Sequence, residues 1–383
     1  MTRPRHYRCC IAAALFVLAA IATPTAQAQT FTVLHHFTLA DGSEPSGLRL
    51  DAAGNLYGTT LLGGAADQGV VFELNAAGET VLLSFTGAEG TDPTTGVIRD
   101  PAGNLYGTTA GGVTPFGQVF KLDKAGGVTV LHSFTGGVDG GEPNALIRDP
   151  NGNIYGTTYI GGTWGHGVAF KLDANGAETI LHNFEGPDGG QPASKLTRDL
   201  DGDLYGTTYG GGISPGNGVV FKLDASGSET VLYSFTGGAD GAKPHAGLIR
   251  DPAGNIYGTT TRGGMVNRAC PDGCGVVFKL DPAGNETVLH SFTGGADGMS
   301  PTTTLICDTA GNLYGTTSTG GATGWGVVFE VDAAGTETVL HSFTGGDDGG
   351  DPETGLVRDQ AGNLYGTTAY GPSDYGAAFK LRP

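Results

Sequence analysis

Tyr57-Gly58-Thr59-Thr60 is the first of seven copies of one tetrapeptide in this chain of 383 residues. The copies begin at Tyr57, Tyr106, Tyr155, Tyr205, Tyr257, Tyr314 and Tyr365. Their successive spacings are 49, 49, 50, 52, 57 and 51 residues. A repeat of about 50 residues that contains four short strands is typical of a β-propeller blade. The seven copies therefore predict an all-β fold, a single seven-bladed β-propeller with four antiparallel strands per blade.

One repeat shows the four expected strands. They cover residues 247–251, 256–260, 275–280 and 286–292, and most are rich in β-branched and aromatic residues. The first two strands are joined by a tight turn at 252–255 and the last two by a turn at 281–284. In the first turn Pro252 presets φ and Gly254 supplies a left-handed residue. The period therefore reflects strand–turn–strand units, and no useful length of sequence has helical periodicity.

Phenylalanine occupies two fixed places in each repeat. In the third strand it is Phe72, Phe120, Phe170, Phe221, Phe278, Phe329 and Phe379. In the fourth strand it is Phe37, Phe85, Phe134, Phe184, Phe235, Phe292 and Phe343. Because a single repeat cannot bury its apolar faces alone, we expect these rings to pack each blade against the next.

The two ends of the repeat region complement each other. Residues 31–37 read as a lone fourth strand, and residues 377–381 read as a third strand without a fourth. Pairing them completes one blade and removes the exposed edges that an open array would keep. We expect residues 29–383 to form one circularly closed domain.

The first 28 residues have the pattern of a secretory signal peptide. Arg3, Arg5 and Arg8 precede an apolar run at 11–22, and Ala26-Gln27-Ala28 is a small-x-small cleavage site. A retained membrane anchor is the alternative, but the run is too short to span a bilayer comfortably. We predict cleavage after Ala28, export to the periplasm or the exterior, and no membrane span in the mature chain.

The charge of the mature chain limits its partners. Residues 1–28 hold three arginines and no acidic residue, so the remainder carries 17 basic and 38 acidic residues, a formal charge of −21. Such a surface repels nucleic acid. We expect no nucleic-acid partner and a monomer, although nothing in the sequence determines the oligomeric state.

Three cysteines follow the signal segment. Cys270 and Cys274 flank Pro-Asp-Gly, which in an exported protein predicts a small disulfide loop. A metal site is the alternative, but two cysteines without a neighbouring histidine are too few ligands. Cys307 follows Leu305 and Ile306, and we expect it to be a buried free thiol.

The repeats resemble those of the Gloeo/Verruco tandem repeat family, exported bacterial proteins also called choice-of-anchor tandem repeat proteins. The resemblance rests on Gly-Asn-Leu-Tyr-Gly-Thr-Thr at 54–60, Gly-Val-Val-Phe-Lys-Leu-Asp at 218–224 and Thr-Val-Leu-His-Ser-Phe-Thr-Gly at 338–345. It covers essentially the whole mature chain. It implies an exported location and no particular activity. The sequence given ends at Pro383 without a hydrophobic sorting tail, which favours free secretion or the periplasm over surface anchoring.

Loops on one face of the ring, here called the upper face, carry the candidate sites. This face receives the loops from each fourth strand to the next first strand, and from each second strand to the third. The first kind of loop reads acidic-Gly-x-x-Pro, with Asp41, Glu89, Asp139, Asp188, Asp240, Asp297 and Asp348. A calcium-binding ring is one interpretation. We favour turn capping, because all seven blades share the residue and Asp commonly caps such turns.

The repeated histidines of the fourth strand are also expected to be structural. They are His35, His132, His182, His290 and His341, and the other two blades have Leu83 and Tyr233. A functional site would not tolerate that set of replacements.

One position breaks the symmetry, just before the first Gly of the third strand. Around the ring it is Gln68, Phe116, His166, Asn217, Cys274, Trp325 and Tyr375, here called the rim residues. Trp164 lies two residues before His166, and Arg268 lies in the longest loop. Aromatic rings beside polar groups suit sugars and peptides. We predict ligand-binding roles for Phe116, Trp164, His166, Asn217, Arg268, Trp325 and Tyr375, although these side chains could instead only fill space between loops.

The sequence thus predicts an exported propeller that binds a carbohydrate or a peptide on its upper face. The chain has no Gly-x-Ser-x-Gly, His-Glu-x-x-His or cysteine-based zinc motif, so we predict no catalytic residue, no metal site and no cofactor. One alternative is a lyase or hydrolase at the channel mouth, with His166 and a carboxylate such as Asp188 as acid and base. Another is a structural envelope protein without a small ligand.

Overall fold

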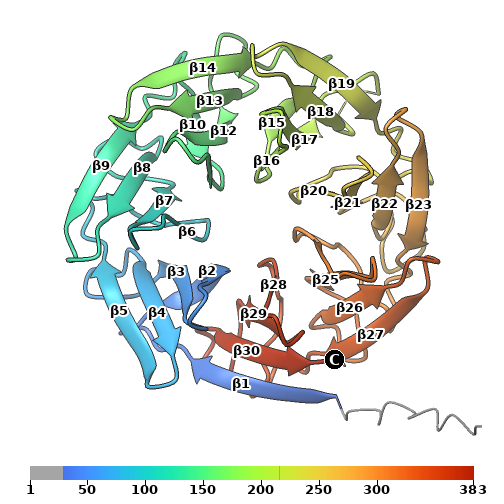
Figure 1. Cartoon of the computed structure of the whole chain (residues 1–383). Helices are drawn as coiled ribbons and strands as arrows, with labels where there is room; N and C mark the ends of the chain where they lie inside the picture. The colour runs from blue at the N-terminus through green and yellow to red at the C-terminus, as the bar shows by residue number, and fades with distance from the viewer. Residues whose placement is uncertain (1–28, 215) are drawn as a thin grey trace, which may run out of the picture.

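The computed structural model describes residues 29–214 and 216–383, which form seven antiparallel sheets arranged in a ring (Figure 1). The predicted seven-bladed β-propeller is therefore confirmed. The predicted signal peptide, residues 1–28, lies outside the described residues. None of the described residues belongs to a helix of the length and hydrophobicity that a membrane crossing needs.

The blades are numbered here in chain order. Blade 1 comprises β2 (Ser43–Leu50), β3 (Leu56–Leu62), β4 (Val70–Asn75) and β5 (Gly78–Ser84), and blade 2 comprises β6 (Ile98–Arg99), β7 (Leu105–Thr109), β8 (Gln118–Leu122) and β9 (Val128–Ser133). Blade 3 comprises β10 (Gly141–Pro143), β11 (Ile147–Arg148), β12 (Ile154–Ile160), β13 (Val168–Leu172) and β14 (Glu178–Asn183). Blade 4 comprises β15 (Gly190–Pro192), β16 (Thr197–Arg198), β17 (Leu204–Gly210), β18 (Val219–Leu223) and β19 (Glu229–Ser234).

The remaining blades follow the same plan. Blade 5 comprises β20 (Ile249–Arg250), β21 (Ile256–Thr260), β22 (Val276–Leu280) and β23 (Glu286–Ser291). Blade 6 comprises β24 (Ile306–Cys307), β25 (Leu313–Thr317), β26 (Val327–Val331) and β27 (Glu337–Ser342). Blade 7 comprises β28 (Val357–Arg358), β29 (Leu364–Thr368), β30 (Ala377–Arg382) and β1 (Thr30–His36).

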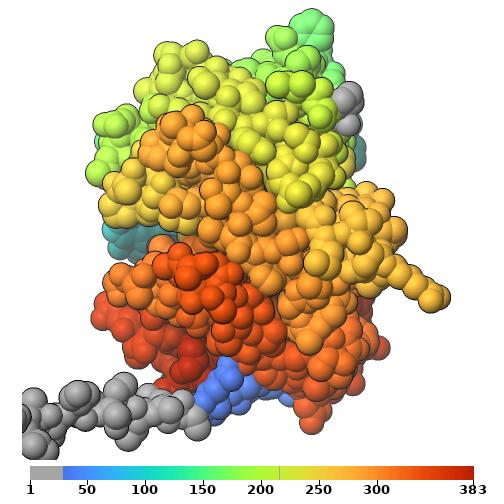
Figure 2. All heavy atoms as spheres, turned by 90° about the vertical axis from the view of Figure 1, so that its right-hand side faces the viewer, coloured from blue at the N-terminus to red at the C-terminus, as the bar shows by residue number. Residues whose placement is uncertain are grey.

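The ring closes through β1, as the two ends of the repeat region predict. Strand β1 pairs antiparallel with β30, with Val33 opposite Phe379, and supplies the outer strand of blade 7. The blue N-terminal strand accordingly lies beside the red C-terminal segments in both views (Figures 1 and 2). The Thr367 hydroxyl also donates a hydrogen bond of 3.2 Å to the Pro45 carbonyl, which ties blade 7 to blade 1. Closure therefore involves strand pairing and an inter-blade bond.

The repeated tetrapeptide is explained by packing inside and between blades. A Cβ atom on Gly206 would lie 2.6 Å from Cζ of Phe221, so only glycine leaves room for the ring on the neighbouring strand. The Thr207 hydroxyl donates a 3.1 Å hydrogen bond to the Ala246 carbonyl of the next blade. Thr208 Oγ1 donates to the Gly210 carbonyl and accepts from the Val219 N–H, which fixes the start of the second-to-third-strand loop.

The recurring phenylalanines pack each blade against the next, as predicted. Each fourth-strand ring meets the third-strand ring of the following blade edge-on, with centroids 5.0–5.3 Å apart. Phe343 and Phe379 form one of these pairs, and Phe37 and Phe72 form the pair that completes the ring. All of these rings are fully buried. Edge-to-face pairs of this kind add about 0.5–1.5 kcal/mol each to the burial of apolar area.

Two local predictions were wrong. The first strand of blade 5 covers only Ile249–Arg250 instead of 247–251, because the preceding backbone bonds to neighbouring blades: the Gly247 N–H donates to Thr304 Oγ1. Cys307 is exposed, not buried. Leu305 is buried, whereas Cys307 ends the strand at the register position where blades 2 and 7 have Arg99 and Arg358, and it faces solvent.

Candidate functional site

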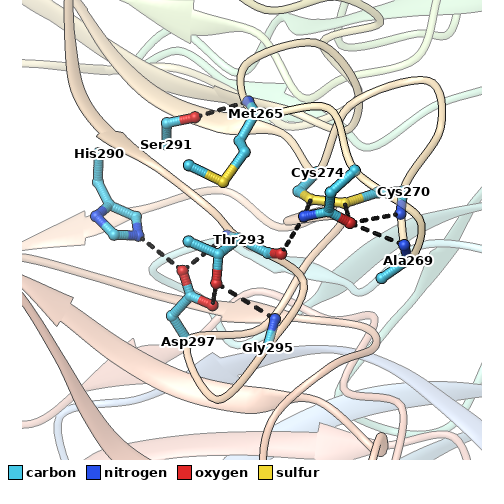
Figure 3. Close-up of a disulfide and its surroundings, with 10 residues drawn as sticks. Met265, Ala269, Cys270, Cys274, His290, Ser291, Thr293, Gly295 and Asp297 are labelled. Carbon is cyan, nitrogen blue, oxygen red and sulfur yellow. Dashed lines mark hydrogen bonds and ion pairs between the residues drawn. A yellow bond between two sulfur atoms is a disulfide. The ribbon is translucent and has the colours of Figure 1, made fainter.

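The acidic residues of the fourth-to-first-strand loops cap their own turns. The Thr293 N–H and hydroxyl donate to Asp297, at 2.8 and 2.5 Å (Figure 3). The same backbone contact to the loop carboxylate occurs in the other blades, from residues Thr38, Thr86, Thr135, Glu185, Thr236 and Thr344. Each carboxylate therefore serves its own loop, which is the structural role that the sequence favours.

The repeated histidines meet these carboxylates at the blade interfaces. His182 Nε2 lies 2.8 Å from Asp188 Oδ2, and His341 Nε2 lies 3.0 Å from Asp348 Oδ2. Asp188 is thus occupied by His182, which weakens the hypothesis that it pairs with His166. Tyr233 replaces histidine in blade 4 and donates to Asp240 at 3.0 Å.

At five interfaces a glutamate from the next blade completes the cluster, and these five clusters are here called the interface triads. Glu178 Oε1 of blade 3 lies 3.7 Å from His132 Nε2 of blade 2. The triads are His35, Asp41 and Glu79; His132, Asp139 and Glu178; His182, Asp188 and Glu229; Tyr233, Asp240 and Glu286; and His290, Asp297 and Glu337.

The two interfaces without a triad have matched replacements. Leu83 stands where the other blades have His or Tyr, and the residue at the position of the glutamate is Val128; both pack on the same apolar cluster. At the blade 6–7 interface Phe31 replaces the glutamate and stacks on the His341 ring at 3.9 Å. Because these replacements preserve complementarity across the interface, the triads belong to blade packing.

The rim residues are spread around the ring, one per blade, and do not converge on one cavity. Their carbonyls accept hydrogen bonds from the next loop, as Phe116 does from the Glu142 N–H at 2.8 Å and Trp325 does from the Asp351 N–H at 2.9 Å. Several of their side chains cover a loop glycine: the Trp325 ring lies directly over Gly345, and the Asn217 amide lies against Gly237. His166 lies against Gly186 and Gly190. The rim residues thus help to hold neighbouring loops together.

Two aromatic surfaces remain open on the upper face. Trp164 is 58% exposed, and Trp325 is 39% exposed and meets Tyr370 edge-on at 5.7 Å. Tyr375 packs against the blade 7–1 core cluster. Of the predicted binding residues, Trp164 and Trp325 therefore offer the clearest aromatic surface.

The long loop of blade 5 is braced by a disulfide between Cys270 and Cys274 (Figure 3). Asn267 donates to the Thr293 carbonyl at 2.7 Å, and the Met265 N–H donates to Ser291 at 2.9 Å. Arg268 is exposed on this loop. The yellow-orange segment that contains the loop projects beyond its neighbours in Figure 2.

The central channel holds a cavity of about 490 Å³, lined by the first-strand segments of all seven blades. The residue after each loop proline varies around the ring: Ser46, Thr94, Asn144, Ala193, His245, Thr302 and Glu353. All of these except Asn144 line the cavity, and Asn144 lines a neighbouring hollow with Thr94 and His245, so we call this ring the mouth. A hollow of about 300 Å³ at the mouth is lined by Glu44, Thr94, His245, Thr302 and Glu353 among others. Sequence analysis missed this ring, although its variation after an invariant proline was a signal of the same kind as that of the rim.

The mouth has an uneven electrostatic character. Burial and the neighbouring Glu44 raise the pKa of Glu353, and burial and Glu353 raise the pKa of Asp351 to about 6. Burial lowers the pKa of His245, which favours its neutral form. One side of the mouth therefore holds crowded carboxyl groups, and His245 lies on another blade of the same hollow.

We expect the two tryptophans to differ in their contribution to stability. Trp164→Ala should change the free energy of unfolding by less than about 0.5 kcal/mol, because the side chain is mostly exposed. Trp325→Ala should cost about 1–2 kcal/mol, since the ring packs on Gly345, Gly350 and Tyr370. Denaturant unfolding of both variants measures this difference, and equal losses would contradict the packing described for Trp325.

Solved structures show similarity at the level of the fold. Virginiamycin B lyase from Staphylococcus aureus, in a catalytically inactive variant with quinupristin, superposes with a TM-score of 0.64 at 14% identity, covering 93% of this chain and 99% of the lyase. The extracellular domain of a hybrid two component system from B. thetaiotaomicron has a TM-score of 0.60 at 12% identity, covering 92% of this chain and 41% of that one. PorZ, a surface component of the type-IX secretion system of Porphyromonas gingivalis, has a TM-score of 0.53 at 14% identity, covering 88% of this chain and 46% of PorZ.

The sequence itself matches one family. No curated protein matches it. The profile of the Gloeobacter/Verrucomicrobia repeat matches residues 19–146, 110–305 and 214–383, which together cover nearly the whole chain. This match agrees with the resemblance of the repeated motifs, and the chain belongs to the Gloeobacter/Verrucomicrobia repeat family.

Proposed function

We propose that this protein is an exported binding propeller whose ligand, a carbohydrate or a peptide, sits at the channel mouth on the upper face. The observation that carries the proposal is the hollow at the mouth, where Thr94, Thr302, His245 and Glu353 face one space. Hydroxyl, imidazole and carboxyl groups around a concave surface suit the polar groups of sugars and peptides. Trp164 and the Trp325–Tyr370 pair would contact parts of the ligand that extend across the face.

Export is part of the proposal. The pattern of residues 1–28 is that of a signal peptide. Two proteins of the same fold are an extracellular domain and a bacterial surface component. Fractionation of cells that express the full chain tests this part, and a product retained inside the cell with residues 1–28 attached would contradict it.

The binding test uses substitutions that the ring already contains. In the double variant His245→Thr and Glu353→Thr, both positions take the residue of blade 6, so the fold should persist. Titration calorimetry with glycans and peptides that raise the melting temperature of the wild type should show at least about tenfold weaker binding. His36→Thr, on the exposed side of β1, is the control.

Three outcomes would change the assignment. Retained binding in the double variant, with loss in Trp164→Ala and Trp325→Ala, would move the site from the mouth to the rim. A panel without any binder would favour a structural envelope protein. Unchanged affinity in all variants would exclude the upper face.

A lyase or hydrolase activity is the second candidate. It is favoured by the presence of His245 and Glu353 in one hollow, since a neutral imidazole near a carboxyl group can act as a general base. Mass spectrometry of bound compounds after long incubation distinguishes the two functions. An unchanged mass supports binding alone, and a product that disappears with His245→Thr supports the enzyme.

A further inference from the structure

Two blades place a positively charged side chain on the channel wall, where most other blades have an uncharged residue. Arg49 of β2 pairs with Tyr57. The residue at that register position in the other blades is Ile98, Ile147, Thr197, Ile249, Ile306 or Val357. Blade 1 therefore places a guanidinium group where the ring otherwise has an uncharged side chain.

Blade 1 has the order Arg49-Leu50, whereas blade 2 has the apolar residue first and the arginine second, as Ile98-Arg99. In four interfaces the residue one position later is an arginine that lies over a tyrosine ring of the preceding blade, as Arg99 does over Tyr57 at 5.3 Å. Blade 1 has Leu50 at that position, and Leu50 packs in the same apolar cluster as Tyr365. Arg49 is thus not used for stacking, and it lines the channel cavity instead.

Blade 4 supplies the second cation. Lys195 lines the same cavity, and the corresponding residues of blades 2, 5, 6 and 7 are Gly96, Gly247, Thr304 and Gly355. Both Lys195 and Arg49 reach the water of the channel. Burial by the channel wall and the charge of Arg49 lower the pKa of Lys195, so the two cations act on each other within one space.

Neither cation is neutralised by a carboxylate. Among the described residues, the ion pairs within 4.0 Å include neither Arg49 nor Lys195. The acidic groups of the mouth belong to Glu44, Asp351 and Glu353; burial and a neighbouring carboxyl group raise the pKa of Asp351 and of Glu353. Glu353 lines the same cavity, but no carboxylate of the described residues lies within 4.0 Å of either cation. The two like charges therefore repel each other, and an anion placed between them would reduce that cost.

We propose that the channel cavity, between Arg49 and Lys195, binds the anionic group of a small molecule, a carboxylate or a phosphate. A guanidinium group and an ammonium group are the side chains that bind such oxygens best. The volume of about 490 Å³ lies in the range of small-molecule pockets. This inference goes beyond the proposed function and does not depend on it, because neither His245 nor Glu353 takes part in holding the anion.

Pyridoxal phosphate is a suitable probe, since its aldehyde forms an imine with a neutral lysine and its phosphate requires a cation nearby. After brief treatment at neutral pH and borohydride trapping, peptide mass spectrometry should find Lys195 modified about tenfold faster than the exposed Lys124. Inorganic phosphate, glucuronate and N-acetylalanine should each protect Lys195 if they bind there. Their relative protection distinguishes a phosphate ligand from an acidic sugar or a peptide carboxylate.

Substitutions that copy other blades provide the controls. Arg49→Ile should slow the labelling of Lys195 by pyridoxal phosphate more than its labelling by neutral pyridoxal, because only the phosphate uses the guanidinium group. Lys195→Gly should abolish labelling at this position without loss of the fold. The double variant at His245 and Glu353, which line the same cavity, should not slow labelling, because it keeps both cations and removes only a carboxylate that repels the anion. This result would separate the anion site from the proposed function. Labelling of Lys195 no faster than that of Lys124, absence of protection by all three anions, or equal slowing of both aldehydes by Arg49→Ile would overturn the proposal.

Discussion

The melting temperature should fall by about 5–15 °C as the pH rises from about 5 to about 8, because the interface glutamates must lose their protons. Burial, followed by the charge of the loop aspartate, raises the pKa to about 7 for Glu79, Glu178, Glu286 and Glu337. Burial also raises the pKa of Glu229 to about 7, while His182 lowers it and Asp188 raises it by smaller amounts. Each of the five has a buried oxygen without a hydrogen-bond partner, where a negative charge is poorly solvated.

The direction follows from proton binding. The ordinary pKa of the glutamate carboxyl is 4.5, so between about pH 4.5 and 7 the folded protein binds more protons than the unfolded chain. The stabilisation by the protonated glutamates is complete below pH 4.5, and it is lost as the pH rises through their raised pKa of about 7. One pKa unit corresponds to about 1.4 kcal/mol, and after allowance for partial exposure we expect about 1–2 kcal/mol per site.

Three interface histidines change the stability with pH in the opposite direction to the glutamates. Burial lowers the pKa of His132, His290 and His341, against the attraction of their loop aspartates. Their neutral forms stabilise the fold above pH 6.5, and that contribution is lost as the pH falls below this value. Since the glutamates are more numerous and their pKa reaches about 7, the net change with rising pH is a loss of stability.

Glutamine variants test the assignment. Glu178→Gln should leave the melting temperature at pH 5 nearly unchanged and raise it at pH 8, because the amide imitates the protonated carboxyl group. Replacing all five interface glutamates should remove most of the pH dependence. Glu185→Gln, an exposed residue of the neighbouring loop, is the control. A wild-type curve that is flat across this range, or one that keeps its slope in the fivefold variant, would contradict the role of the triads.

A chain that lacks residues 29–37 should fail to melt cooperatively and should associate through the exposed edge of β30. Strand β1 supplies every backbone partner on the outer side of β30. Phe37 is fully buried and pairs with Phe72 at 5.0 Å, and loss of such a ring alone costs about 3–5 kcal/mol. An unpaired, largely apolar strand edge also invites pairing between chains. Calorimetry and size-exclusion chromatography measure the two effects.

A circular permutant provides the matched control. In blade 3 the pair Leu172 and Glu178 is joined by the turn 173–177, and in blade 7 Leu381 and Phe31 stand at the same register without a covalent link. A chain of residues 38–381, a copy of 173–177 and residues 31–37 should therefore fold and melt cooperatively. A deleted chain that melts like the full one, or a permutant that does not fold, would contradict closure by β1.

The fold could be predicted from the sequence because its determinants are local and repeated. The glycine of each tetrapeptide leaves room for a particular phenylalanine. The unpaired fourth strand at residues 31–37 and the unpaired third strand at 377–381 predict that the ring closes. The prediction for Cys307 was wrong because it rested on the apolar residues Leu305 and Ile306 before it, whereas the register position of Cys307 is that of Arg99 and Arg358 in other blades. The mouth was missed for a different reason: Thr94, His245 and Glu353 are far apart in sequence, and only the closed ring brings them to one space.

The apolar interface between blades 1 and 2, at Leu83 and Val128, has a consequence for how the blades pair during folding. Seven blades of nearly the same sequence could pair in the wrong order while the chain folds. Any blade that begins its outer strand with glutamate would bury an unmatched carboxyl group beside Leu83, whereas blade 2 brings Val128. The contact of Phe31 with His341 marks the junction of blades 6 and 7 in the same way. We therefore expect the interfaces between blades 1 and 2 and between blades 6 and 7 to favour the native order of the blades during folding.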